Sequence, residues 1–270
     1  MFTFILAMIT EFLLSYDIYS WQILSIVFVA GFVAGFINTF AGFGTALNYL
    51  LFSLLGIPIN VANGTVRLGV IMQSITTSIH FYRKGELDLV KGFFIAIPVT
   101  IGSIVGAEIA VHINIEIFEK INGLVLILML ILLFYDSNRW IKGKEIHTSR
   151  KVTYWHIAAY MLIGVYGGFV HIGVGIFLII ALVWISGYDL VKATALKMFV
   201  VLIYTPFVFS VFAMNGQIEY VLGIVTGVGN LIGGLIAAKL VLKWGAKVIR
   251  WSIIFMMIIF ISKLLGIIDF

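Results

Sequence analysis

A long apolar stretch without any charged residue, from Trp21 to Gly56, constrains the fold of this chain more than any other feature. About 20 residues span the hydrocarbon core of a bilayer, so the stretch is too long for one membrane-spanning helix and barely long enough for two. Glycines interrupt it near its middle, where Asn38 and Thr39 add polar side chains. A second stretch, Gly164 to Gly187, has the same plan with His171 at its glycine break. The sequence therefore predicts two broken helical hairpins with these polar residues at their tips.

The rest of the chain is similarly apolar. Of its 270 residues, 62% are hydrophobic and 11% are charged, whereas soluble domains carry roughly 45–50% apolar and about 25% charged residues. Apolar runs of membrane-spanning length recur throughout, which predicts an all-α polytopic membrane protein. The absence of cysteine excludes disulfides and thiolate metal sites. No HExxH, P-loop or GxSxG motif is present, so we expect no metal, no cofactor and no enzymatic activity.

The two halves of the chain follow one plan. GIPINVANGTVR aligns with SGYDLVKATALK, AGFINTFAG with GGFVHIGVG, and GSIVGAEIA with GNLIGGLIA. This alignment places Arg67 opposite Lys197 and Asn38 opposite His171. Internal duplication of this kind is common in transporters. We expect a lead-in segment at 1–20, a first repeat at 21–136, a linker at 137–151 and a second repeat at 152–270, each repeat being a hairpin followed by three transmembrane helices.

Basic residues form three clusters, which the positive-inside rule places on the cytoplasmic side. They are Arg83, Lys84 and Lys91; Arg139, Lys142, Lys144, Arg150 and Lys151; and Lys239, Lys243, Lys247 and Arg250. Both termini are then extracytoplasmic and the central linker is cytoplasmic. Counting the crossings leaves each hairpin re-entrant on its own side, so the two repeats have inverted topology. Topology also explains the net charge of +5, without nucleic acid as a partner.

Arg67 and Lys197 are the leading candidates for function. Each lies about two turns into a predicted span, where a charge costs at least about 2.5–3.5 kcal/mol and is usually functional. These cations can bind an anion or gate its path; the alternative is snorkelling or structural pairing. The hairpin tips add helix N–H groups with partial positive charge, which also attract anions.

Polar side chains near the tips complete the predicted substrate site. Asn38, Thr39 and His171 can contact a ligand there or cap the broken helices. The same two alternatives apply to the polar residues that precede the cations, which are Asn63, Thr65 and Thr194. Two residues can couple proton movement to transport. One is His171, which can titrate near neutral pH, and the other is Glu108, which can instead pair with a basic group.

The first hairpin and the helix after it carry a specific motif. The residues that form it are Gly35-Phe36-Ile37-Asn38-Thr39, Ala41-Gly42, Gly56, Pro58, Ala62-Asn63, Thr65 and Arg67. This motif resembles the first repeat of the TauE/SafE sulfite exporter family. GGFVHIGVG and KATALK resemble the second repeat more loosely, and the resemblance covers residues 21–267. Phe43 interrupts the glycine run, and His171 stands where small or hydrophobic residues are usual.

The resemblance implies export of sulfite, or of an organosulfonate such as sulfoacetate, across the plasma membrane of a prokaryote. We therefore expect a secondary transporter that works by alternating access. Its partners would be a small anionic substrate and the lipid bilayer. The sequence leaves open whether the protein forms a homodimer. A small-anion channel, or a transporter of another small anion, is the main alternative. An intramembrane enzyme built on His171 lacks an evident partner acid, and a non-transporting subunit would not need Arg67 and Lys197 in its spans.

Overall fold

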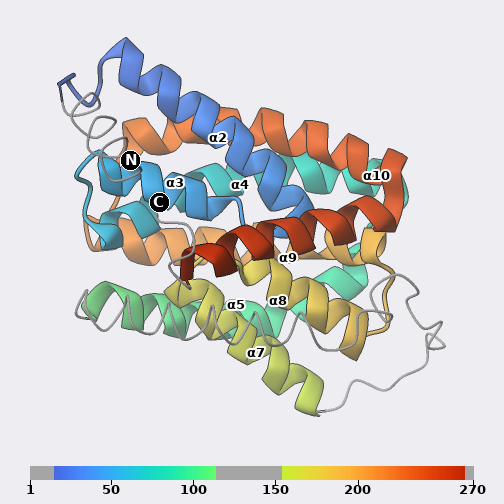
Figure 1. Ribbon diagram of the computed structural model, residues 1–270. Helices are drawn as coiled ribbons and strands as arrows, with labels where there is room; N and C mark the ends of the chain where they lie inside the picture. Colours follow the sequence, from blue (N-terminus) through green and yellow to red (C-terminus); the bar gives the residue numbers. More distant parts are fainter. Residues whose placement is uncertain (1–14, 114–153, 265–270) are drawn as a thin grey trace.

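The computed structural model describes residues 15–113 and 154–264, which form helices and no strand within these two ranges (Figure 1). The first range holds α2 (Trp21–Ala41), α3 (Thr45–Leu54), α4 (Ile59–Arg83) and α5 (Leu89–His112). The second holds α7 (Tyr154–Phe169), α8 (Val174–Ile180), the π-helix η2 (Ala181–Ile185), α9 (Leu190–Met214) and α10 (Tyr220–Leu264). The last predicted transmembrane helix of the first repeat, the predicted linker and most of the lead-in segment lie outside the described residues.

Helix lengths fit the membrane prediction. Four described helices are long and apolar enough to cross a bilayer, namely α2, α5, α9 and the part of α10 before its kink at Gly245. The helix α3 has 10 residues and so extends about 15 Å, roughly half of the hydrocarbon core. Each predicted hairpin therefore pairs a longer helix with a short one, and the prediction of an all-helical membrane protein is confirmed.

Both hairpins break beside a glycine in the left-handed conformation. Gly42 follows the end of α2 and has a φ of 73°, and Gly173 precedes α8 with the same φ. Glycine suits both positions because a β-carbon is disfavoured at positive φ. The prediction that Asn38 and Thr39 sit at the break is wrong, because α2 remains helical until Ala41 and both residues lie in its last turn. His171 does lie in the second break, between α7 and α8.

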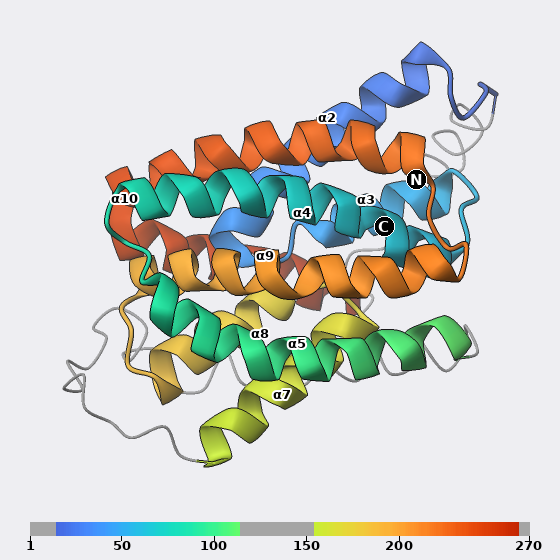
Figure 2. The same ribbon diagram turned by 180° about the vertical axis from the view of Figure 1, so that it is seen from behind.

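Each hairpin returns to the end of the molecule at which it starts (Figures 1 and 2). At one end, the Tyr19 hydroxyl donates to Glu219 Oε2 over 2.9 Å, and the Glu219 backbone N–H donates to Thr65 Oγ1 over 2.9 Å. The starts of α2 and α4 therefore lie beside the α9–α10 connection. Gln217 donates to the Val111 carbonyl over 3.4 Å, which brings the end of α5 to the same place. The α4–α5 and η2–α9 connections lie at the opposite end (Figure 2).

The helix α2 packs on α10 through bare backbone. A β-carbon built at Gly31 would lie 2.4 Å from the Thr226 carbonyl oxygen, and one at Gly35 would lie 2.3 Å from that of Asn230. Real β-carbons do not approach this closely, so only glycine fits this seam. Small residues of this kind let membrane helices pack backbone to backbone.

The helix α7 packs on α5 in the same way. A β-carbon at Gly164 would lie 2.2 Å from the Val99 carbonyl oxygen, and one at Gly168 would lie 1.9 Å from that of Ser103. Four more glycines lie on the other side of these two seams, and they are Gly102, Gly106, Gly229 and Gly233. Both seams join the first described range to the second, so the two halves of the chain are interlocked.

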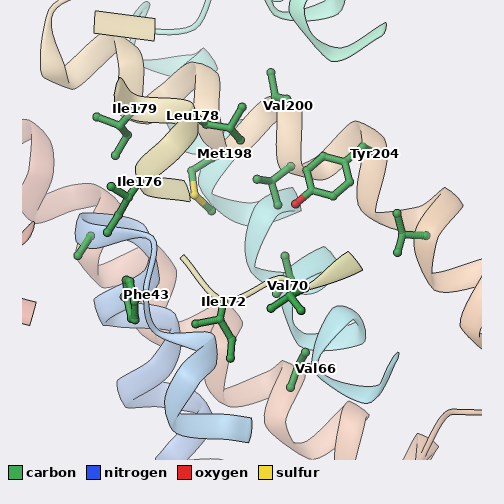
Figure 3. Close-up of a cluster of buried hydrophobic side chains, with 14 of the residues drawn as sticks. Phe43, Val66, Val70, Ile172, Ile176, Leu178, Ile179, Met198, Val200 and Tyr204 are labelled. Atoms are coloured by element: carbon green, nitrogen blue, oxygen red, sulfur yellow. The ribbon is translucent and has the colours of Figure 1, made fainter. Parts of the chain in front are cut away.

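The central helices α4 and α9 contact each other between the two seams. Apolar side chains from these helices surround the broken segments (Figure 3). Phe43 and Ile172 come from the two breaks, whereas Val66 and Val70 come from α4. The Tyr204 ring extends from α9 toward the second break (Figure 3). The broken backbone is therefore enclosed by protein, as irregular backbone at membrane depth requires.

Candidate functional site

Arg67 is fully buried and holds the end of the opposite hairpin's first helix. Its guanidinium donates to the carbonyl oxygens of Gly167 over 3.1 Å and Gly168 over 2.7 Å, in the last turn of α7. It also donates to Asn63 Oδ1 over 3.0 Å, and the Phe212 ring centroid lies 5.1 Å from its central carbon. These contacts leave the Arg67 Nε–H buried without a partner among the described residues.

Lys197 does the same for the first hairpin. Its Nζ donates to the carbonyl oxygens of Asn38 over 2.9 Å and Thr39 over 2.8 Å, in the last turn of α2. The side chain is 1% exposed. An ammonium group has three N–H donors. Because Lys197 has these two acceptors in the part of the chain that the structure describes, one of its N–H donors has no partner there. Each half of the chain therefore supplies the cation for the other half's broken helix.

Helix C-termini carry partial negative charge, so cations are complementary to them. The ion pairs between described residues are Lys91 with Asp88 and Lys192 with Asp189, and all four of these side chains are solvent-accessible. Neither Arg67 nor Lys197 has a carboxylate partner in residues 15–113 and 154–264. Their full burial rules out snorkelling to a surface, and the hydrogen-bond partners of both basic side chains within the described residues are neutral dipoles.

Asn63 links Arg67 to the start of the second break. Its Nδ2 donates to the Phe169 carbonyl over 2.8 Å, at the last residue of α7, and its Oδ1 also accepts the hydroxyl of Tyr49 from α3. Of the predicted site residues, Asn63 and Arg67 therefore belong to one network. Tyr49 was not predicted, because its partner lies on another helix and nothing near Tyr49 in the sequence marks it.

Asn38 and Thr39 belong to a second network, which is centred on Gln73 of α4. The Gln73 Nε2 donates to the Gly35 carbonyl over 2.9 Å and to Thr39 Oγ1 over 2.8 Å, and its Oε1 accepts from Asn38 Nδ2 over 3.2 Å. These bonds brace the last turn of α2, whose carbonyls hold Lys197. Gln73 was recognisable from the sequence only as part of a polar face on its helix.

His171 lies between the two networks. Its Nδ1 is 3.1 Å from the Tyr204 hydroxyl of α9, and its carbonyl accepts from Thr45 Oγ1 over 3.4 Å, at the first residue of α3. The imidazole is close enough to both Arg67 and Lys197 for their charges to act on it. The tip of each hairpin thus meets the other, and His171 is an ionisable group at their junction, beside Arg67 and Lys197.

Three predicted residues lie away from these networks. Thr65 Oγ1 donates to Val61 and accepts from Glu219 at one end of the molecule, and Thr194 Oγ1 donates to Leu190 of its own helix. Both threonines are buried. Glu108 is exposed near the end of α5. None of these three side chains forms a hydrogen bond with either network in the described part of the chain.

Comparison with known proteins points to membrane transport. The family model described as "Sulfite exporter TauE/SafE" matches residues 27–264. A "Probable membrane transporter protein" of Haemophilus influenzae is 29% identical over 90% of this chain and 94% of its own length. A "Probable membrane transporter protein ORF9" of a Sinorhizobium species is 26% identical over 92% and 94%. "Probable membrane transporter protein YfcA" of Escherichia coli K12 is 26% identical over 90% of each chain. No solved structure matches significantly.

Proposed function

Because the chain belongs to the TauE/SafE sulfite exporter family of membrane transporters, we propose that it exports a small sulfur-containing oxyanion. The substrate would be sulfite or an organosulfonate such as sulfoacetate, carried across the cell membrane of a prokaryote. The observation that carries this proposal is the pair of buried cations, Arg67 and Lys197, which lack a carboxylate partner in the described part of the chain. A bound oxyanion would supply the missing negative charge.

The hydrogen-bond donors of Arg67 and Lys197 that lack a partner favour an oxyanion as the ligand. The Arg67 Nε–H has no partner among the described residues, and one hydrogen of the Lys197 ammonium has none. Tetrahedral and pyramidal oxyanions present several acceptor oxygens, and charge-assisted hydrogen bonds to them are about twice as strong as neutral ones. Asn38, Thr39, Asn63 and His171 would provide the polar surroundings. Thr65, Thr194 and Glu108 would act at the ends of the path.

We also propose that the two halves are inverted repeats that move against each other. The seams support this, because Gly31 and Gly35 of α2 correspond to Gly164 and Gly168 of α7 in the sequence alignment and meet α10 and α5 in the same manner. Rocking of one repeat would separate a cation from the opposite carbonyls. An anion that takes those hydrogen bonds would then stabilise the open arrangement, which is the differential binding that alternating access needs.

The first test measures anion binding to the purified protein by calorimetry and thermal shift, with sulfite, sulfoacetate, sulfate, phosphate and chloride. We expect saturable binding of a sulfur oxyanion that weakens at least tenfold, about 1.4 kcal/mol, in Arg67→Gln and in Lys197→Gln. Arg83→Gln and Lys192→Gln are matched controls, since each removes an exposed charge from the same helix, α4 or α9. A folded protein that responds to no anion would contradict the proposal.

A second test separates a transporter from a small-anion channel. In proteoliposomes loaded with unlabelled substrate, a transporter that works by alternating access exchanges it for labelled substrate outside, and this counterflow saturates. A channel gives flux that follows the gradient alone. Single cysteines at Ser15, Gly85 and Asn215 test the proposed orientation, because the native chain has no cysteine. Ser15 and Asn215 should react from outside the cell, and Gly85 should not.

A further inference from the structure

Three lysines gather where α4 and α10 run together toward one end of the molecule. Lys84 ends α4, while Lys239 and Lys243 lie one turn apart on α10. All three are exposed. The imidazole of His80, in the last turn of α4, is close enough to Lys84 and Lys239 for their charges to act on it. Two helices therefore bring two positive charges close to one half-buried histidine, and Lys243 lies one turn beyond Lys239.

This cluster differs from the other lysines at the same end. Lys91 lies 3.2 Å from Asp88 and Lys192 lies 3.8 Å from Asp189, so each is paired with the aspartate that caps its own helix. Lys84, Lys239 and Lys243 have no carboxylate within ion-pair distance among the described residues. Glu86, two residues beyond Lys84, is the acidic residue nearest to the cluster in sequence.

His80 adds a second feature that topology alone does not explain. Its Nε2 is buried and has no hydrogen-bond partner within the described ranges. Basic residues that serve only to orient the chain in the membrane need no such group, because they remain solvated. A buried imidazole nitrogen beside unpaired lysines is instead a hydrogen-bonding group that lacks a partner, which an oxygen of a bound ligand would supply.

Apolar side chains continue from the cluster toward the middle of the helices. Ile75 and Ile79 precede His80 on α4 and are 42% and 46% exposed, and Ile232 and Ile236 precede Lys239 on α10 and are 37% and 39% exposed. On α10 this spacing places Ile232 and Ile236 on the same face as Lys239 and Lys243, whereas Ile75 and Ile79 share a face of α4 with Arg83. Trp244, beside Lys243, is 48% exposed. The surface thus has a charged end and an apolar stripe, so it is complementary to an amphiphilic ligand.

We propose that this surface binds an anionic phospholipid. The phosphodiester would lie between Lys84, Lys239 and Lys243 with an oxygen on His80 Nε2, and the acyl chains would lie along the isoleucine stripe. Basic pockets between transmembrane helices commonly bind anionic head groups. The apolar stripe favours a lipid over free phosphate, which would leave it uncovered. The proposal does not depend on the transported anion, since Arg67 and Lys197 take no part in it.

The test uses the full-length protein in a neutral detergent, with phosphatidylglycerol or phosphatidylcholine added and the melting temperature measured. We expect saturable stabilisation by phosphatidylglycerol alone, with its apparent affinity lowered at least tenfold in the double variant Lys84→Gln/Lys239→Gln. The control is Lys91→Gln/Lys192→Gln, which removes the same charge from the same end. It should bind phosphatidylglycerol as the native protein does, and so should Arg67→Gln.

Three outcomes would overturn the proposal. Equal weakening in the two double variants would show a diffuse charge effect rather than a site. Equal stabilisation by water-soluble glycerol phosphate would show a phosphate site without lipid. No preference for phosphatidylglycerol over phosphatidylcholine would show that the surface does not recognise an anionic head group. If the first double variant does not fold, the single variant Lys239→Gln replaces it in the melting experiment. Mass spectrometry of the native protein then shows whether phosphatidylglycerol is retained, which tests the same proposal.

Discussion

The two hairpins are built to one plan but break at different places. Gly35 aligns with Gly168 and Gly42 with Gly175, yet α2 continues to Ala41 whereas α7 already ends at Phe169. Relative to the aligned glycines, the second helix ends more than one turn earlier. Asn38 therefore stays inside a helix, while its counterpart in the second half lies in open backbone.

The difference decides what each tip can do. The first tip is braced by Gln73, which fixes the last turn of α2 through three hydrogen bonds. The second tip offers the His171 ring, which bonds to Tyr204 and lies near both buried cations. One tip is thus held in place, and the other presents an ionisable group. A duplicated fold can divide rigidity and response between its two copies in this way.

The largest expected effect comes from the point where the tips touch. A β-carbon at Gly42 would lie 2.7 Å from the Gly175 Cα, and one at Gly175 would lie 2.7 Å from the Gly42 Cα. Both alanine variants should lose about 1–3 kcal/mol of stability through overpacking. Gly42→Ala should lose about 1–2 kcal/mol more, because its φ is positive. Unfolding in detergent micelles measures both.

Gly85→Ala is the control for this experiment. Gly85 has a φ of 75° and nothing within 4 Å of an added β-carbon, so it isolates the backbone strain. If Gly42→Ala were no more destabilising than Gly85→Ala, the two tips would not be in contact.

The second effect concerns the networks that hold each broken helix. Asn63→Leu and Gln73→Met each remove three hydrogen bonds at similar side-chain volume. At about 0.6 kcal/mol for each bond in a membrane protein, both should cost roughly 2 kcal/mol. Asn63→Leu should cost more, because it also deprives the buried Arg67 of a partner. Equal unfolding free energies would show that the two networks are equivalent.

A smaller effect tests the special position of the second tip. The His171–Tyr204 bond should contribute about 0.6 kcal/mol and at most about 1.7 kcal/mol. A double-mutant cycle with His171→Phe and Tyr204→Phe measures it through unfolding free energies. Coupling near zero would mean that the ring and the hydroxyl do not interact, and the contrast between the tips would then rest on Gln73 alone.

The smallest effect lies outside the membrane, where α5 and α9 begin at Asp88 and Asp189 in the two halves. The backbone N–H of Lys91 holds the pKa of Asp88 below its usual value. The stabilisation from this cap is therefore present above the unfolded pKa of about 3.9, and it is lost as the pH falls through the folded pKa. Because the side chain is exposed, we expect less than about 1 kcal/mol.

Unfolding of the native protein and of Asp88→Asn between pH 3 and 7 measures this effect. The native protein should lose stability in acid that the variant, whose amide also caps the helix but does not titrate, retains. Parallel stability curves would contradict the assignment, and Asp189→Asn gives the matching value for the second half.

Much of the fold could be predicted, because apolar runs and glycine breaks determine helices locally. The hairpin of the second repeat is followed by α9, a helix of membrane-spanning length as predicted, and both breaks fall within the predicted hairpins. The position of Asn38 was misjudged because helix α2 ends at Gly42, where φ is positive, and not at the polar residues before it.

The site was predicted less completely. The burial of Arg67 and Lys197 could be expected from their place in the spans, but their partners are carbonyls of the opposite half, far away in sequence. No local pattern marks such a contact. Tyr49 and Tyr204 escaped prediction for the same reason, since a tyrosine in an apolar helix gains a role only from the chain that packs against it.

The interlocked seams have a consequence for how the protein is made. The glycine face of α2, with Gly31 and Gly35, is covered by α10, and the face of α5 is covered by α7. The ribosome completes α2 nearly two hundred residues before it reaches the helix that covers it. The glycine face of α2 must therefore stay uncovered by α10 in the membrane until that helix is made. Assembly of this protein is thus a late event in its synthesis, completed only after the last quarter of the chain has been inserted.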